Sequence, residues 1–225
     1  MISQYYWYFW GDKTRCSTWN TRKIIKQEKN VPRGTYKYLT IKMEQFTKEQ
    51  KLTFLRNTVR NIPDFPIPGI QFKDVTPLFN TKESLSILTD VLLEEYKGKG
   101  ITKVVGIESR GFIMGPIMAL ELGAGFVPIR KPGKLPAEVF EEEYEKEYGV
   151  DKIQIHKDSL YEDDVVLIHD DLLATGGTMF AAYNLVKRMG VKNIYVNFII
   201  ELEELKGRTL FPKDVDIKAL IQFSI

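Results

Sequence analysis

The second half of the sequence alternates between short apolar runs and longer helical stretches. The short runs are rich in β-branched residues, which is typical of buried strands. Expected strands cover 103–107, 125–129, 165–169, 193–200 and 217–223, and expected helices cover 111–122 and 179–189. This alternation predicts an α/β fold in which helices flank a central, mostly parallel sheet. In such sheets ligands bind at the carboxyl ends of the strands, near a topological switch point.

The stretch 165–178 contains the strongest candidate binding site. An apolar run ends at His169, and two carboxylates, Asp170 and Asp171, follow it. A small-residue turn comes next, formed by Ala174, Thr175, Gly176, Gly177 and Thr178. Glycines let consecutive N–H groups converge, and a helix N-terminus adds its positive end. We therefore expect a phosphate cradle beside two acids that suit sugar hydroxyls or a Mg²⁺-linked ligand. A plain turn into a helix is the structural alternative.

A second strand–helix junction lies at 106–112 and includes Ser109 and Arg110. The guanidinium group of Arg110 offers a fork of donors that suits pyrophosphate. Taken alone, a surface salt bridge between Arg110 and Glu108 explains this segment about as well. Its position at a strand end, like that of the first motif, favours anion binding.

Three cations, Arg130, Lys131 and Lys134, lie within five residues at the end of an expected strand. This density of positive charge suits a polyphosphate. The stretch 131–151 is too charged and irregular for a core, and it is long enough to form a mobile lid. A solvated charge run is a reasonable alternative for residues 141–145.

The segment before the sheet contains two expected helices and a proline-rich connection. Thr47 begins a capping box, and Leu52, Leu55, Val59 and Ile62 form a helical stripe after it. Residues 62–69 contain three prolines and predict an extended loop. The second helix begins near 80–83 and ends near Gly98. A rigid connector is one interpretation of residues 65–77, and the sequence alone does not reject it.

Residues 1–42 differ in composition from the remaining chain. They carry a net charge of +7, whereas residues 43–225 carry −5, and they contain all three Trp residues and the only cysteine, Cys16. We expect a boundary here, with an atypical N-terminal extension of 1–42 and a main domain of 43–225. The extension is interpreted as a mis-assigned start upstream of Met43, a disordered basic tail or a nucleic-acid-binding arm. A single cysteine and the lack of a long apolar run suit a cytoplasmic protein without a membrane partner.

Together these motifs resemble those of type I phosphoribosyltransferases, and the Leu-Leu-Ala-Thr-Gly-Gly-Thr stretch is similar to adenine phosphoribosyltransferases in particular. The resemblance covers about residues 43–225. It implies the type I fold with an N-terminal hood and a flexible catalytic loop. It further implies purine salvage, in which phosphoribosyl pyrophosphate (PRPP) and adenine give AMP and pyrophosphate.

The resemblance also assigns expected roles. Asp170 and Asp171 face the ribose hydroxyls, the 174–178 turn holds the 5′-phosphate, and Ser109 and Arg110 belong to the pyrophosphate loop. The Glu108–Ser109 bond is a candidate for a cis peptide. On the catalytic loop, Arg130 and Lys134 contact pyrophosphate or the partner subunit, Glu147 is the loop acid and Tyr148 is the adjacent aromatic residue. In the hood, Phe72 stacks on the purine, and backbone groups near Gln71 and Lys73 read its edge.

Three residues depart from the family pattern: Gln71 and His169 stand where aliphatic residues are usual, and Lys73 stands where Arg is usual. We interpret His169 as a packing residue whose charge could still tune the site near pH 7. No metal-ligand set is expected in the chain, because Mg²⁺ would be held through PRPP and water. The resemblance implies a homodimer that binds small molecules and no nucleic acid. Two alternatives stay open, a 6-oxopurine phosphoribosyltransferase and a PRPP-sensing transcription regulator.

Overall fold

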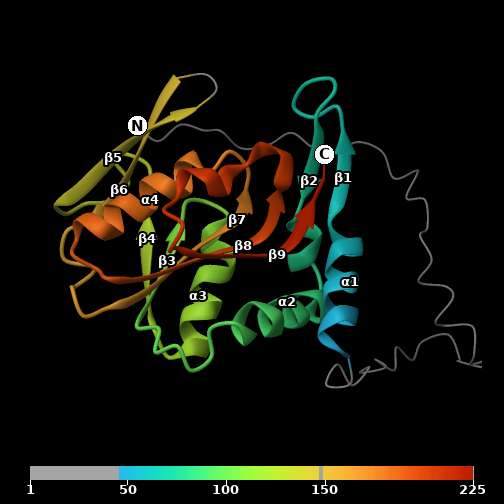
Figure 1. Ribbon diagram of the computed structural model, residues 1–225, viewed down its shortest axis with the longest axis horizontal. Helices are drawn as coiled ribbons and strands as arrows, with labels where there is room; N and C mark the ends of the chain where they lie inside the picture. Colours follow the sequence, from blue (N-terminus) through green and yellow to red (C-terminus); the bar gives the residue numbers. More distant parts are fainter. Residues whose placement is uncertain (1–45, 147–148, 225) are drawn as a thin grey trace, which may run out of the picture. The chain divides into compact units, whose positions relative to one another are not determined.

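The computed structural model describes residues 46–146 and 149–224, and within them five parallel strands form a sheet in the order β4-β3-β7-β8-β9 (Figure 1). The predicted α/β class is therefore confirmed. The order reverses between β3 and β7, so the topological switch point lies at the ends of these two strands. The strands are β3 (Lys103–Ile107), β4 (Gly125–Ile129), β7 (Val165–Leu173), β8 (Asn193–Leu202) and β9 (Asp216–Phe223).

Helices cover both faces of the sheet (Figure 1). Neighbouring strand residues point to opposite faces, so Val104 packs with one helical layer and Val105 with the other. The first layer consists of α1 (Lys48–Thr58), α2 (Lys82–Glu94) and α3 (Gly111–Leu122). The second contains α4 (Gly177–Arg188), which follows β7 directly.

The predicted start of α1 is confirmed, but its predicted stripe is too long. Thr47 accepts a hydrogen bond from the backbone of Gln50 at 3.2 Å, and the side chain of Gln50 accepts one from the backbone of Thr47 at 3.0 Å. The helix ends at Thr58, and Ile62 belongs to a strand, β1 (Arg60–Pro63). This strand pairs antiparallel with β2 (Gln71–Asp74), and Ile62 lies opposite Phe72. A continued helix would not give Ile62 this pairing.

The charged stretch after β4 is not irregular, which corrects the sequence expectation. Strands β5 (Val139–Lys146) and β6 (Gly149–His156) form an antiparallel ribbon. Tyr144 is buried in the core on the α4 side and Phe140 packs against that core, and the glutamates between and around these two residues made the stretch look irregular. The end of β4 is tied to this ribbon, because Arg130 and Gln154 exchange backbone hydrogen bonds at 2.9 and 2.7 Å.

The hairpin β1–β2, which we call the hood, lies against the end of β9 (Figure 1). The ammonium of Lys73 lies 5.0 Å from the ring centre of Phe223, the last residue of β9. Short 3-10 turns complete the described chain: η3 (Thr76–Phe79), η4 (Glu203–Leu205) and η5 (Gly207–Leu210). Within the described residues, no helix is long and apolar enough to cross a membrane. The expectations for residues 1–42, Glu147 and Tyr148 lie outside the described residues.

Candidate active site

Strand β7 carries both candidate acids into the site. The strand was predicted to end at His169, but it continues to Leu173, so that Asp170 and Asp171 lie within it. The extension follows from β8, which offers a pairing partner as far as Leu173, opposite Glu201. Because strand residues alternate in direction, the two acids do not share one face, and Asp171 is only 3% exposed.

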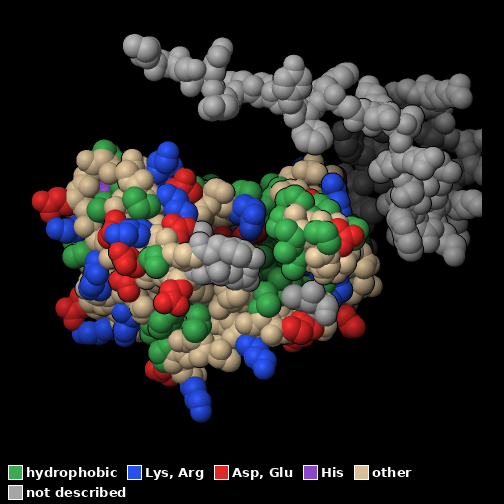
Figure 2. Space-filling view, turned by 90° about the horizontal axis from the view of Figure 1, so that it is seen from above, with side chains coloured by type: hydrophobic (Ala, Val, Ile, Leu, Met, Phe, Trp, Pro, Cys, Tyr) green, Lys and Arg blue, Asp and Glu red, His purple; other side chains and the backbone are tan. Residues whose placement is uncertain are grey.

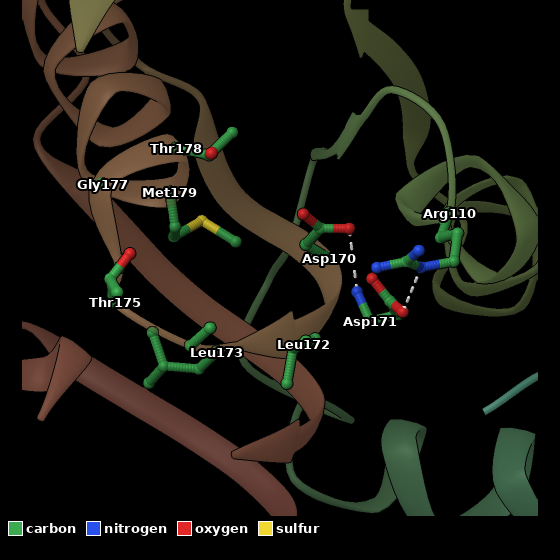
Figure 3. A pocket seen from close by; sticks show the side chains of 11 residues that line it. Arg110, Asp170, Asp171, Leu172, Leu173, Thr175, Gly177, Thr178 and Met179 are labelled. Carbon is green, nitrogen blue, oxygen red and sulfur yellow. Dashed lines mark hydrogen bonds and ion pairs between the residues drawn. The ribbon is translucent and has the colours of Figure 1, made fainter. Parts of the chain in front are cut away.

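The predicted turn after β7 forms a cradle at the start of α4. Gly176 has a φ of +86°, a left-handed conformation that favours glycine, and α4 begins at Gly177. The first N–H groups of a helix have no partner within it, so they are available to an anion. The cradle surrounds a hollow of about 180 Å³ (Figure 3). All five predicted turn residues line it, together with Arg110, Asp170, Asp171, Leu172, Leu173 and Met179.

A second hollow, of about 170 Å³, shares Arg110 and both acids with the first. Glu108 and Ser109 complete its lining, and the predicted cis peptide between them is confirmed. Figure 3 shows the side chain of Arg110 reaching toward Asp171, and its Nε donates to the Asp171 carboxylate at 2.5 Å. Gly111 lets the start of α3 lie this close to β7, because a Cβ at position 111 would be only 2.7 Å from the carbonyl oxygen of His169.

Burial and charge set the protonation of this cluster. Burial raises the pKa of Asp170 well above its ordinary value, and the neighbouring Asp171 charge raises it further. The backbone N–H of Asp171 donates to Asp170 at 2.9 Å and opposes that rise. Burial works against the charge of Arg110, but Asp171, Asp170 and Asp74 together raise its pKa. The site therefore holds the permanent positive charge of Arg110 beside two neighbouring carboxyl groups.

His169 is a neutral packing residue, as interpreted, and it does not carry charge near pH 7. It is fully buried, and burial lowers its pKa to about 4. Its Nδ1 lies 2.8 Å from Oδ1 of Asn197, whose amide donates to Tyr96 at 3.2 Å. The expectation that a charge on His169 tunes the site is wrong, because the sequence did not reveal how deeply the side chain is buried.

The predicted cations of the catalytic loop lie beside the hollows rather than in their lining. Arg130 pairs with Glu108, with nitrogen–oxygen distances of 3.2 and 3.3 Å, and donates to the carbonyl of Lys134 at 3.2 Å. The backbone N–H of Lys131 and the Arg130 guanidinium lower the pKa of Glu108. Lys131 itself bonds to Asp151 and, at 3.0 Å, to Tyr144, which fastens β4 to the ribbon. Arg130 thus contacts Glu108, which lines the second hollow. The side chain of Lys134 does not line either hollow.

The hood residues also lie outside the lining of both hollows. Asn61 ties down the side chains of Gln71 and Lys73, at 2.7 and 2.9 Å. Phe72 lies on the opposite side of β2 and meets Phe65 edge-on, with ring centres 5.1 Å apart. Asp74, which sequence reasoning missed, connects the hood electrostatically to Arg110. Asp74 lies inside the segment 65–77 that the sequence analysis singled out, but no sequence pattern gave it a role.

The tip of the hood exposes apolar side chains. Phe65 is 50% exposed and Ile67 is 52% exposed. Figure 2 shows hydrophobic side chains gathered over this end of the molecule. The hood therefore offers aromatic and aliphatic surface beside a charged site.

Comparisons with known proteins agree with this geometry. A model of the phosphoribosyl transferase domain matches residues 75–221. An adenine phosphoribosyltransferase of Bacteroides fragilis is 68% identical over 163 residues, which cover 72% of this chain and 92% of that protein.

Solved structures give the same result. The adenine phosphoribosyltransferase of Rhodothermus marinus superimposes with a TM-score of 0.73 at 48% identity, covering 78% of this chain and 99% of that one. The enzyme of Saccharomyces cerevisiae, solved with an imino-altritol bisphosphate and adenine, gives 0.72 at 40% identity, covering 76% and 99%. With its type I phosphoribosyltransferase fold and these relatives, the chain belongs to the adenine phosphoribosyltransferase family.

Proposed function

We propose that the chain transfers the 5-phosphoribosyl group of PRPP to adenine and releases AMP and pyrophosphate, a reaction of purine salvage. One observation carries the proposal: two hollows share Arg110, Asp170 and Asp171 at the switch point of the sheet. A sugar that bears an anion at each end requires two anion-binding places on either side of hydroxyl-binding groups. The family membership makes adenine the acceptor.

The cradle is the fixed end of the transfer. The 174–178 turn holds the 5′-phosphate with its backbone N–H groups and the positive end of α4. Asp170 and Asp171 accept hydrogen bonds from the ribose hydroxyls. Fixing the sugar at both places aligns its C1′ carbon with N9 of adenine, which lowers the entropic part of the barrier. Attack by N9 forms the new glycosidic bond as the bond to pyrophosphate breaks, with inversion at C1′, and the proton of N9 is released.

The second hollow takes the leaving group. Arg110 and the backbone around Ser109 stabilise the charge that develops on pyrophosphate. Arg130 and Lys134 add positive charge from the end of β4 once the loop closes over the substrate. Glu147 lies outside the described residues, and its assigned role is to assist proton movement or to order the closed loop. Closure excludes water from an oxocarbenium-like transition state.

Mg²⁺ fits this site as a companion of the substrate. Within residues 46–146 and 149–224, no group of three His, Cys, Asp or Glu side chains is arranged to hold a metal ion. Mg²⁺ commonly keeps several waters and binds through one or two carboxylates and substrate phosphates. Asp170 and Asp171 are the carboxylates that line both hollows. When bound, the ion neutralises charge on the pyrophosphate group.

The hood supplies the purine site. Strand β2 pairs only with β1 among the described strands, so its outer edge presents backbone N–H and C=O groups near Gln71 and Lys73. A donor and an acceptor at this edge distinguish a 6-amino from a 6-oxo purine, since the two groups exchange places between these bases. Phe72 stacks on the ring face.

We also propose that the enzyme acts as a homodimer in the cytoplasm. Leu120 on α3 is 79% exposed and Ile113 is 38% exposed, which leaves apolar surface for a second copy. Light scattering coupled to size exclusion gives the mass directly. A monomeric mass at the assay concentration contradicts the dimer.

Competition among purine bases tests the proposed specificity. Each of adenine, guanine, xanthine and hypoxanthine is supplied with PRPP and Mg²⁺, and steady-state kcat/KM is compared. We expect adenine to exceed the 6-oxopurines by at least about a hundredfold, because a wrong exocyclic group leaves buried donors and acceptors unpaired. A preference for any 6-oxopurine contradicts the proposal.

A further inference from the structure

The segment after β8 packs directly against the phosphate-binding turn. Strands β7 and β8 leave the sheet at the same level, because Leu173 is paired with Glu201. The chain then turns back through η4 and η5, and this places Gly207 in contact with the 174–178 turn. A Cβ on Gly176 would lie 2.5 Å from the carbonyl oxygen of Gly207, so the two backbones touch with no room for a side chain between them.

Position 207 requires glycine because there is no room for a side chain next to the turn, not because of its backbone angles. A Cβ at this position would lie 2.8 Å from Cδ1 of Leu173 and 3.0 Å from the backbone nitrogen of Gly176, and it would overlap the carbonyl oxygen of Ala174. Real Cβ contacts are not this short, so any larger residue must displace the turn or the segment beneath it. The backbone N–H groups that face the phosphate belong to this same turn.

Arg208 anchors this contact to the sheet. Its Nε and Nη2 donate to the two carboxylate oxygens of Glu201 at 2.6 and 2.7 Å, and its Nη1 donates to the carbonyl of Ile217 at 2.7 Å. The Glu201 side chain is only 6% exposed. A bidentate pair with a buried carboxylate fixes both position and orientation, which a lysine does not reproduce. The residue next to Gly207 is therefore held to β8 and β9 together.

Phe211 holds the same segment against the helix that follows the turn. It is 7% exposed, and its ring centre lies 5.4 Å from that of Phe180 and 5.9 Å from that of Tyr183, both on α4. The segment from 203 to 211 thus touches the turn through Gly207 and the helix through Phe211, and Arg208 fastens it to the sheet.

We propose that Arg208, with Gly207, is a positioning residue for the 5′-phosphate: the Arg208–Glu201 fork presses the Gly207 backbone against residues 174–176 and so sets the direction of their N–H groups. Neither residue contacts the substrate. The inference rests on the proposed function, because it assigns the phosphate of PRPP to this turn. Loosening the fork then weakens binding of the phosphorylated sugar and leaves adenine binding unchanged.

Three variants test this inference, with one control for the two Arg208 variants and one for the glycine variant. Arg208→Gln removes the fork, Arg208→Lys keeps the charge without the fork, and Gly207→Ala introduces the overlapping Cβ. Lys192→Gln removes a surface ion pair with Glu162 just before β8 begins, and Gly125→Ala adds a Cβ whose nearest atom, 3.3 Å away, belongs to the flexible Lys103 side chain. Neither control residue belongs to the site.

We measure KM for PRPP and for adenine separately, the thermal midpoint, and calorimetric binding of ribose 5-phosphate. For Arg208→Gln and Gly207→Ala we expect KM for PRPP and the Kd of ribose 5-phosphate to rise about tenfold, with KM for adenine within about twofold. Arg208→Lys should recover only part of the loss. Both controls should match the parent protein.

Folded variants with unchanged ribose 5-phosphate affinity overturn the inference, as does an equal rise in both KM values. If Arg208→Gln does not fold, Gly207→Ala decides, because it leaves the ion pair in place. The proposed function fails separately: a parent protein that binds ribose 5-phosphate but transfers nothing to adenine contradicts the activity, while the calorimetric comparison still tests the role of Arg208.

Discussion

The Nε of Arg110 lies 2.5 Å from the carboxylate of Asp171, and this ion pair joins the start of α3 to β7 across the switch point of the sheet. The Arg110 side chain is 45% exposed, whereas that of Asp171 is 4% exposed. The buried acid therefore fixes one edge of an open guanidinium. A guanidinium has five N–H donors, so the bond to Asp171 leaves most of the fork to face an anion. This pair makes the two hollows, which share Arg110 and Asp171, a single unit.

Replacing Arg110 with lysine tests the importance of the fork. Lysine keeps the positive charge but cannot hold Asp171 and an anion in one plane. We expect kcat/KM for PRPP to fall about thirtyfold, with KM for adenine nearly unchanged. Steady-state kinetics measures both values. Arg188→Lys, at the far end of α4, serves as the control, and an Arg110→Lys enzyme with normal kcat/KM refutes the assignment.

The two strand carboxylates are expected to serve catalysis more than folding. In Asp170→Asn together with Asp171→Asn, amide oxygens still accept hydrogen bonds, but the charge that binds ribose hydroxyls and complements Arg110 is lost. We expect kcat/KM to fall at least about a hundredfold, while the thermal midpoint changes by a few degrees at most. The control is Asp90→Asn: Asp90 is an exposed residue on α2 that forms an ion pair with Lys51 of α1. Normal turnover in the double variant contradicts the ribose assignment.

Local patterns predicted the parts of the structure that depend on local physics. The capping box at Thr47, the five sheet strands and the turn at 174–178 each follow from neighbouring residues. Their boundaries shifted where a partner strand decided the outcome. Strand β7 extends to Leu173 because β8 continues beside it, and Ile62 joins β1 because β2 pairs with it.

Other features depend on contacts between distant segments, and the sequence did not reveal them. The ribbon β5–β6 was interpreted as irregular because charged residues alternate with the few apolar ones that α4 covers. The bond between Arg110 and Asp171 spans 61 positions, and the sequence suggested only a local ion pair, with Glu108, as the alternative to anion binding by Arg110. Gly207 carries no side chain to mark its contact with Gly176, which only the folded backbones make visible.

The buried histidine makes stability depend on pH. The pKa of His169 falls from 6.5 to about 4 in the folded protein because the side chain is buried. Between these values the unfolded chain binds more protons, so its free energy of unfolding decreases as the pH falls through this window. We expect His169 to account for a loss of about 2 kcal/mol between about pH 7.5 and about pH 5.

Urea unfolding at both pH values measures this contribution, and His169→Leu provides the comparison. The variant loses the hydrogen bond to Asn197 and has a lower stability at pH 7.5, but the contribution of His169 to the pH dependence of the free energy of unfolding disappears. If the free energy of unfolding changes equally with pH in the parent protein and the variant, His169 does not titrate as its burial requires.

Product analysis tests the central claim most directly. Purified enzyme is supplied with isotopically labelled adenine, PRPP and Mg²⁺, and AMP and pyrophosphate are quantified over time. The account predicts that both products form in equal amounts and that neither forms when adenine or PRPP is omitted. Release of pyrophosphate without labelled AMP, or no turnover of adenine in a folded enzyme, would contradict it.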